Sequence, residues 1–260
     1  MSITALPYVN WIFWAALGSG TLFVVGTTRG TTRGYRVFTA ALLAVVAALL
    51  LVSDLFLPAQ GVAVNTADVR RPLVIAFCAL VAAYLAASIV APERHAARLV
   101  LAVIGALAGI VALVSLAASS GTRSGGLFAG QLVLSALALG AVHAAMLLGH
   151  WYLVTPKLSP APLRRMMWLL IAALSVQLLA VAIALIVVSA GPLTGGLAPL
   201  TWLRVGVGLL LPLGVTVLAL LASRAASLQA TTGLLYIGLA LVAAGSIAGS
   251  SLTYLTGVPV

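Results

Sequence analysis

The most constraining feature of this sequence is a series of long apolar runs that no charged side chain interrupts. Residues 41–52 and 169–188 form two of these runs, and the second is twenty residues long. A helix of about twenty apolar residues spans the hydrocarbon core of a bilayer. A membrane-spanning strand would instead alternate apolar and polar residues with a period of two. The runs therefore predict transmembrane α-helices.

Composition leads to the same class of protein. The chain is 63% hydrophobic and only 6% charged, whereas a soluble domain carries about 25% charged residues. Its surface must therefore meet lipid, where backbone polar groups have to be satisfied internally. We expect one all-α domain over residues 1–260, a polytopic transmembrane helix bundle of about eight spans: Tyr8–Gly26, Arg36–Leu57, Pro72–Ala91, Ala97–Ala118, Phe128–Val154, Met166–Ala190, Leu200–Ala222 and Thr232–Leu255.

The distribution of Lys and Arg predicts the orientation of the bundle. Nine basic residues follow spans one, three, five and seven: Arg29, Arg33, Arg36, Arg94, Arg98, Lys157, Arg164, Arg165 and Arg224. Four fall on the other side: Arg70, Arg71, Arg123 and Arg204. The positive-inside bias puts the nine in the cytoplasm and both termini on the non-cytoplasmic side. The net charge of +10 is thus mostly topological, and no basic patch with interleaved aromatics indicates nucleic-acid binding.

Small residues and one proline predict details of helix packing. Gly105 with Gly109, and Gly245 with Gly249, form small-xxx-small faces that let helix backbones approach closely. Pro212 should kink the seventh span, because proline removes a backbone hydrogen bond and its ring clashes with the preceding turn.

Two histidines are the most unusual polar residues at lipid depth, where polar side chains are costly. His143 and His150 are seven residues apart in the fifth span, hence two turns and about 10.5 Å along one helix face. That separation is too long for one iron or metal ion to take both. His143 either hydrogen-bonds a neighbouring helix or contacts a quinone. His150 either lies among the lipid headgroups, or contacts a quinone, or joins His95 in a haem b or metal site, although no metal-binding motif is present.

The segment after the fifth span combines aromatic and basic residues at the membrane surface. His150, Trp151 and Tyr152 are consecutive, and Arg164 follows a proline-rich loop. One reading is an amphipathic cradle, in which aromatic rings stack on a flat ring and the histidine or the cation binds its oxygens. The other is an aromatic belt next to a positively charged loop.

Asp54 and Arg204 both lie near the outer face of the predicted bundle. They either pair with each other, or snorkel separately to the interface, or form a proton or quinone-headgroup site. The usual nucleophile, zinc, dithiol and phosphate-loop motifs are absent from the sequence. Three acidic residues in the whole chain argue against paired-carboxylate catalysis. These absences argue against classical catalysis by this chain, which we expect to be at most a non-catalytic or quinone-binding subunit of an oxidoreductase.

Three stretches resemble the polysulfide-reductase membrane-subunit family. They are WIFWAALGSG from Trp11 in the first span, SDLFLP from Ser53 at the end of the second, and LTYLTGVPV from Leu252 at the end of the last. Members of this family have eight helices, and they usually place an arginine before the terminal tyrosine. This chain has Thr253 before Tyr254.

The resemblance implies an integral membrane subunit of a respiratory or photosynthetic electron-transfer complex. Such a subunit binds quinone or quinol at one membrane face and exchanges electrons with iron–sulfur or cytochrome partners. Ala-, Gly- and Arg-rich usage is typical of a GC-rich bacterial genome, so we expect a multi-pass protein of the bacterial cytoplasmic membrane. The alternatives are a structural anchor without a site of its own, or a transporter of small solutes or lipids.

Overall fold

The structure is a computed structural model that describes residues 6–57, 67–119, 125–155, 158–187 and 193–259, without the side chains of 117–119. Within these ranges every regular element is helical, and eight helices are long and apolar enough to cross a membrane. The predicted helical class and number of spans are confirmed. Seven of the spans are α1 (Leu6–Thr27), α2 (Arg33–Leu55), α3 (Ala67–Val90), α4 (His95–Ser119), α5 (Gly125–Val154), α6 (Ala161–Val187) and α9 (Leu228–Thr256).

The remaining span changes its helical type along its length. It consists of the 3₁₀ turn η3 (Gly195–Leu197), α7 (Ala198–Trp202), the π-helical segment η4 (Leu203–Leu210) and α8 (Leu211–Arg224). Pro212 lies in the first turn of α8, directly after the π segment. Proline has no N–H to donate to the preceding turn, and the π segment ends two residues before Pro212; the kink at Pro212 stays a prediction. Such segments are frequent at functional sites.

The third span begins earlier than the sequence analysis predicted. Pro72 was expected to be its first residue, but α3 begins at Ala67 and contains the proline. The missing N–H of Pro72 leaves the carbonyl of Asp68 without its usual intrahelical donor. The carboxylate of Asp68 lies in the first turn, where it interacts favourably with the positive end of the helix dipole. Because of this extension, Arg70 and Arg71 belong to α3, and the helix determines the directions of their side chains.

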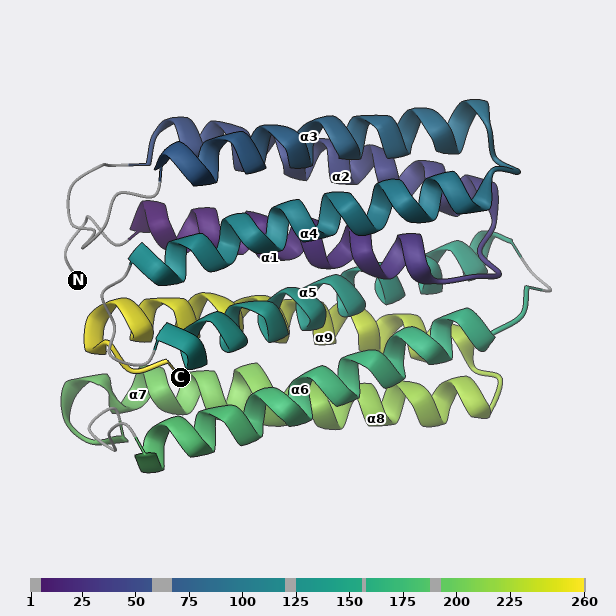
Figure 1. Cartoon of the computed structure of the whole chain (residues 1–260). Coiled ribbons are helices and arrows are strands. Elements are labelled where there is room, and N and C mark those ends of the chain that lie inside the picture. Colours follow the sequence, from purple (N-terminus) through teal and green to yellow (C-terminus); the bar gives the residue numbers. More distant parts are fainter. Residues whose placement is uncertain (1–5, 58–66, 120–124, 156–157, 188–192, 260) are drawn as a thin grey trace.

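The eight spans form two closed rings of four. In the first ring α1 packs on α2, α2 on α3, α3 on α4, and α4 back on α1; in the second, α5, α6, α8 and α9 close in the same way. Contacts of α5 with α1, of α5 with α4 and of α9 with α1 join the rings. The two rings lie side by side as the upper and lower halves of the bundle (Figure 1).

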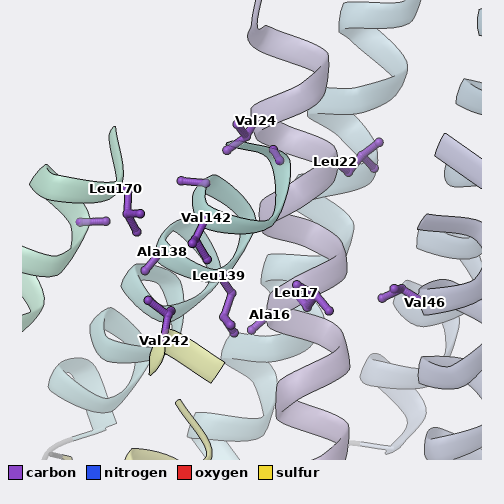
Figure 2. Close-up of a cluster of buried hydrophobic side chains, with 14 of the residues drawn as sticks. Ala16, Leu17, Leu22, Val24, Val46, Ala138, Leu139, Val142, Leu170 and Val242 are labelled. Atoms are coloured by element: carbon purple, nitrogen blue, oxygen red, sulfur yellow. The ribbon is translucent and has the colours of Figure 1, made fainter. Parts of the chain in front are cut away.

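Helices α1 and α5 are the most enclosed spans. Of their most apolar windows 78% and 72% are buried inside the protein, against 28–44% for the other six. Large apolar side chains on those six, such as Val90, Ile186 and Leu218, are exposed and form the surface that faces lipid. The buried cluster between the rings (Figure 2) combines side chains of α1, α2, α5, α6 and α9, among them Ala16, Leu17, Leu22, Val46, Leu139, Val142, Leu170 and Val242.

Glycines allow two close backbone-to-backbone helix contacts. A methyl group added at Gly20 of α1 would overlap the backbone of Ala136, and one added at Gly140 of α5 would overlap the backbone of Gly20. Gly208 of η4 and Gly245 of α9 meet in the same way. The small-residue face that contains Gly245 therefore is a close helix contact, as predicted, and it lies within the second ring.

Both described ends of the chain lie at the same end of the bundle, at the left in Figure 1. We name this the terminal end, where α1 begins and α9 ends. The opposite end carries the turns from α1 to α2, from α3 to α4 and from α8 to α9, and we name it the distal end.

Candidate functional site

Asp54, in the last turn of α2, is fully buried at the terminal end. Its carboxylate accepts hydrogen bonds from Trp11 Nε1 at 3.1 Å and from Arg70 Nε at 2.7 Å. Arg71 Nε donates a third at 3.1 Å. A buried carboxylate is tolerated when it is paired and hydrogen-bonded, and Asp54 is both. We call Trp11, Asp54, Arg70 and Arg71 the Asp54 cluster.

The Asp54 cluster contains more positive than negative charge, with two guanidinium groups and one carboxylate. Arg70 is 6% exposed, and its Cζ lies 5.6 Å from the centre of the Trp11 ring, within the distance of a cation–π interaction. The Arg71 side chain is 46% exposed. The excess positive charge therefore lies where the cluster opens to the surface.

Two tyrosines extend the cluster toward the end of the chain. The rings of Tyr8 and Tyr254 lie 5.4 Å apart. Arg70 is close enough to both to act electrostatically on their hydroxyl groups. Four helix ends thus meet around Arg70: the beginning of α1, the end of α2, the beginning of α3 and the end of α9.

An open groove lies beside the cluster. Arg71 lines it together with Asp68, Pro72 and Ile75, and its volume is about 310 Å³. Small-molecule sites usually occupy about 300–1,000 Å³. Arg71, which binds Asp54, therefore also lines a space large enough for a small ligand.

Sequence reasoning selected Asp54 but missed Arg70 and Arg71. The available signal was the count of basic residues, because these two belong to the four on the side that is poor in positive charge. Arg204 also belongs to these four residues, and it is 3% exposed. The fourth, Arg123, lies outside the described residues, and so does Lys157 among the nine basic residues of the other side. Arginines on the side that is poor in positive charge are not explained by topology, and here two of them bind a buried carboxylate.

Arg204 forms a separate polar site in the second ring. Its guanidinium donates to Gln177 Oε1 at 3.0 Å, and Gln177 Nε2 donates to Ser135 Oγ at 3.1 Å. Arg204 also lines a cavity of about 10 Å³ with Gln131, whose buried amide nitrogen and oxygen have no hydrogen-bond partner. That volume is about enough for one water molecule. The predicted pairing of Asp54 with Arg204, and the alternative that both snorkel outward, are wrong, since each is buried with its own partners.

The histidines have separate surroundings. His143 shares a hydrogen bond of 3.1 Å with Thr21 Oγ1, so it contacts a neighbouring helix as one of the two readings predicted. His150 is exposed, with Nδ1 3.4 Å from the hydroxyl of Tyr236. His95 begins α4 beside Arg98. In the described part of the chain no three or more His, Cys, Asp or Glu side chains could hold a metal together; the haem b and His95–His150 assignments stay predictions.

The aromatic residues at the end of α5 and the basic residue that follows in α6 contact different neighbours. The ring of Trp151 lies 6.4 Å from that of Phe38 on α2. The hydroxyl of Tyr152 in α5 donates to the carbonyl of Ser159 in the following loop at 2.7 Å. Arg164 binds Ser223 at the end of α8, through Oγ at 3.1 Å and the carbonyl at 2.8 Å. Each of these side chains thus contacts a different part of the chain.

The fold and its buried charges define a multi-pass helical membrane protein with two polar sites at its terminal end. Comparison with models of known families, with curated proteins and with solved structures finds no match.

Proposed function

We propose that this chain is a quinone- or quinol-interacting subunit of an electron-transfer complex in the bacterial cytoplasmic membrane, and that the Asp54 cluster binds the quinone headgroup. One observation carries the proposal. The three stretches that resemble the polysulfide-reductase membrane subunits contribute Trp11, Asp54 and Tyr254, which surround Arg70 at the terminal end.

The chemistry of the cluster suits a quinone. A quinone headgroup is flat and accepts hydrogen bonds at its carbonyl oxygens, and guanidinium groups and tyrosine hydroxyls donate such bonds. Tyr254 is the partly exposed aromatic residue of this group, and its ring provides a surface on which a flat headgroup stacks. The carboxylate of Asp54 orients the guanidinium groups of Arg70 and Arg71 beside the groove. Reduction of the quinone adds protons as well as electrons. The electrons come from an iron–sulfur or cytochrome partner subunit.

The orientation of the chain completes the proposal. The excess of Lys and Arg at the distal end supports a cytoplasmic location of that end. Both termini and the Asp54 cluster then lie on the non-cytoplasmic side. A headgroup site at this depth is reached from the lipid phase, which is where quinones with long isoprenoid tails dissolve.

Binding of a short-chain quinone to the purified chain tests the proposal. Quenching of tryptophan fluorescence reports the binding. We expect Arg71→Gln and Tyr254→Phe to weaken binding about tenfold, because each removes a donor. Glu93→Gln, an exposed change at the distal end, should bind like the wild type. A wild-type chain that does not bind the quinone would favour the anchor or transporter alternatives and reject the proposal.

A further inference from the structure

A second cluster of charge lies at the distal end of the first ring, away from the proposed headgroup site. It surrounds a cavity of about 220 Å³ whose lining includes Arg29, Arg36, Tyr84, His95 and Arg98. These residues come from the turn after α1, the first turn of α2, the last third of α3 and the beginning of α4. No acidic residue is among the described residues that line it. We call this the distal basic pocket.

The positive-inside bias explains why basic residues occur at this end but not why they turn inward. Arg98 is 5% exposed and Tyr84 is 1% exposed. Arg36 and Arg98 lie close enough to repel each other. Arg36 donates to the carbonyl of Thr31 and Arg98 to that of Pro92, but neutral carbonyls do not cancel two charges. Such an arrangement is costly unless an anion joins it.

Two buried nitrogens at the pocket have no partner. His95 Nε2 and Arg36 Nε are both buried and make no hydrogen bond with the protein. Buried polar groups are almost always hydrogen-bonded. A ligand whose atoms accept hydrogen bonds would satisfy Arg36 Nε, and also His95 Nε2 in the tautomer that carries its proton on that atom.

Helix dipoles add to the positive potential. Helix α2 begins at Arg33 and α4 begins at His95, so both N-termini lie at this end. The first N–H groups of a helix have no intrahelical acceptor, and they carry partial positive charge. Anions bind readily at such ends.

We propose that the distal basic pocket binds a phosphate-class oxyanion. Guanidinium groups match the geometry of phosphate oxygens and bind them in pairs of hydrogen bonds. The volume of the cavity holds several water molecules and therefore an anion of this size. The phosphate comes either from solution or from the headgroup of an anionic lipid, since basic pockets between membrane helices take such headgroups. This inference does not depend on quinone binding.

Thermal unfolding of the purified, delipidated full chain tests the site. Inorganic phosphate is compared with chloride at equal ionic strength, and short-chain phosphatidylglycerol with a diacylglycerol of the same chains. We expect a phosphate-bearing compound to raise the unfolding temperature. Arg98→Gln should weaken its apparent affinity about tenfold or more, because a charge-assisted hydrogen bond is lost. Arg29→Gln should weaken it too, and this exposed change should not disturb folding.

Arg94→Gln is the matched control, because Arg94 is exposed at the same end and does not line the pocket. It should leave the affinity unchanged. Stabilisation by inorganic phosphate identifies a soluble anion, and stabilisation by phosphatidylglycerol alone identifies a lipid headgroup. The proposal is overturned if neither stabilises the wild type, or if Arg94→Gln weakens binding as much as Arg29→Gln does.

Discussion

Gly20 of α1 and Gly140 of α5 lie backbone against backbone at the joint between the two rings. Neither position has room for a methyl group, so this contact fixes how closely the rings approach. The adjacent bond between Thr21 and His143 crosses the same joint at 3.1 Å. Tyr35 also crosses it, donating to the carbonyl of Ala144 at 2.9 Å.

Gly140→Ala should therefore destabilise the protein. Overpacking a tight contact costs about 1–3 kcal/mol, and here the obstacle is backbone, which cannot rotate away. Thermal unfolding in detergent measures the loss. Gly130→Ala on the same helix, where nothing lies within 4 Å of the added carbon, should be neutral or slightly stabilising because alanine favours helix. Equal effects of the two changes would contradict the close contact.

Asp54→Asn should destabilise the protein by about 3–5 kcal/mol, because it leaves the buried guanidinium of Arg70 without its counter-charge. The double variant Asp54→Asn with Arg70→Gln should recover part of the loss. Chemical or thermal unfolding of the single and double variants gives the coupling energy. Additive losses would show that the ion pair contributes nothing.

Gln177→Leu should cost about 1.5–3 kcal/mol, since Arg204 loses an acceptor in a buried site. Ser135→Ala removes only the hydroxyl that accepts from Gln177, so its cost should be nearer 1 kcal/mol. Unfolding measurements on both variants rank the two bonds. If Ser135→Ala lowered the free energy of unfolding more than Gln177→Leu does, the predicted ranking of the two hydrogen bonds would be wrong.

Cysteine labelling tests the proposed orientation. Cys78 is the only cysteine, so Cys78→Ala gives a background without thiols. On that background Gly196→Cys at the terminal end should react with a membrane-impermeant maleimide in intact cells. Arg94→Cys at the distal end should react only after lysis. Both residues are exposed, and the reverse pattern would invert the orientation.

A chain divided between residues 119 and 125 should reassemble when both halves are expressed together, because each half contains all four helices of its ring. Co-purification through a tag on one half measures reassembly. A cut between residues 57 and 67 divides the first ring instead and should give less complex. Similar yields from both cuts would mean that the rings are not separate units.

The sequence predicted the spans but not their neighbours. Apolar runs determine the number of helices directly, because lipid requires length and apolarity of each span separately. Two of the three partners of Asp54 belong to α3, and they are helical because α3 begins ahead of Pro72. Likewise Gly20 and Gly140 are ordinary small residues in their own helices, and only packing brings them together. Local patterns hold no information about such pairs.

The order of the two rings along the chain has a consequence for synthesis. Since α1 to α4 precede α5, the first ring can close in the membrane while the second is still being translated. Until α5 leaves the ribosome, the face of α1 that carries Gly20 and Thr21 has only lipid against it. The most enclosed contact of this protein can therefore form midway through synthesis, after the first ring and before the second ring closes.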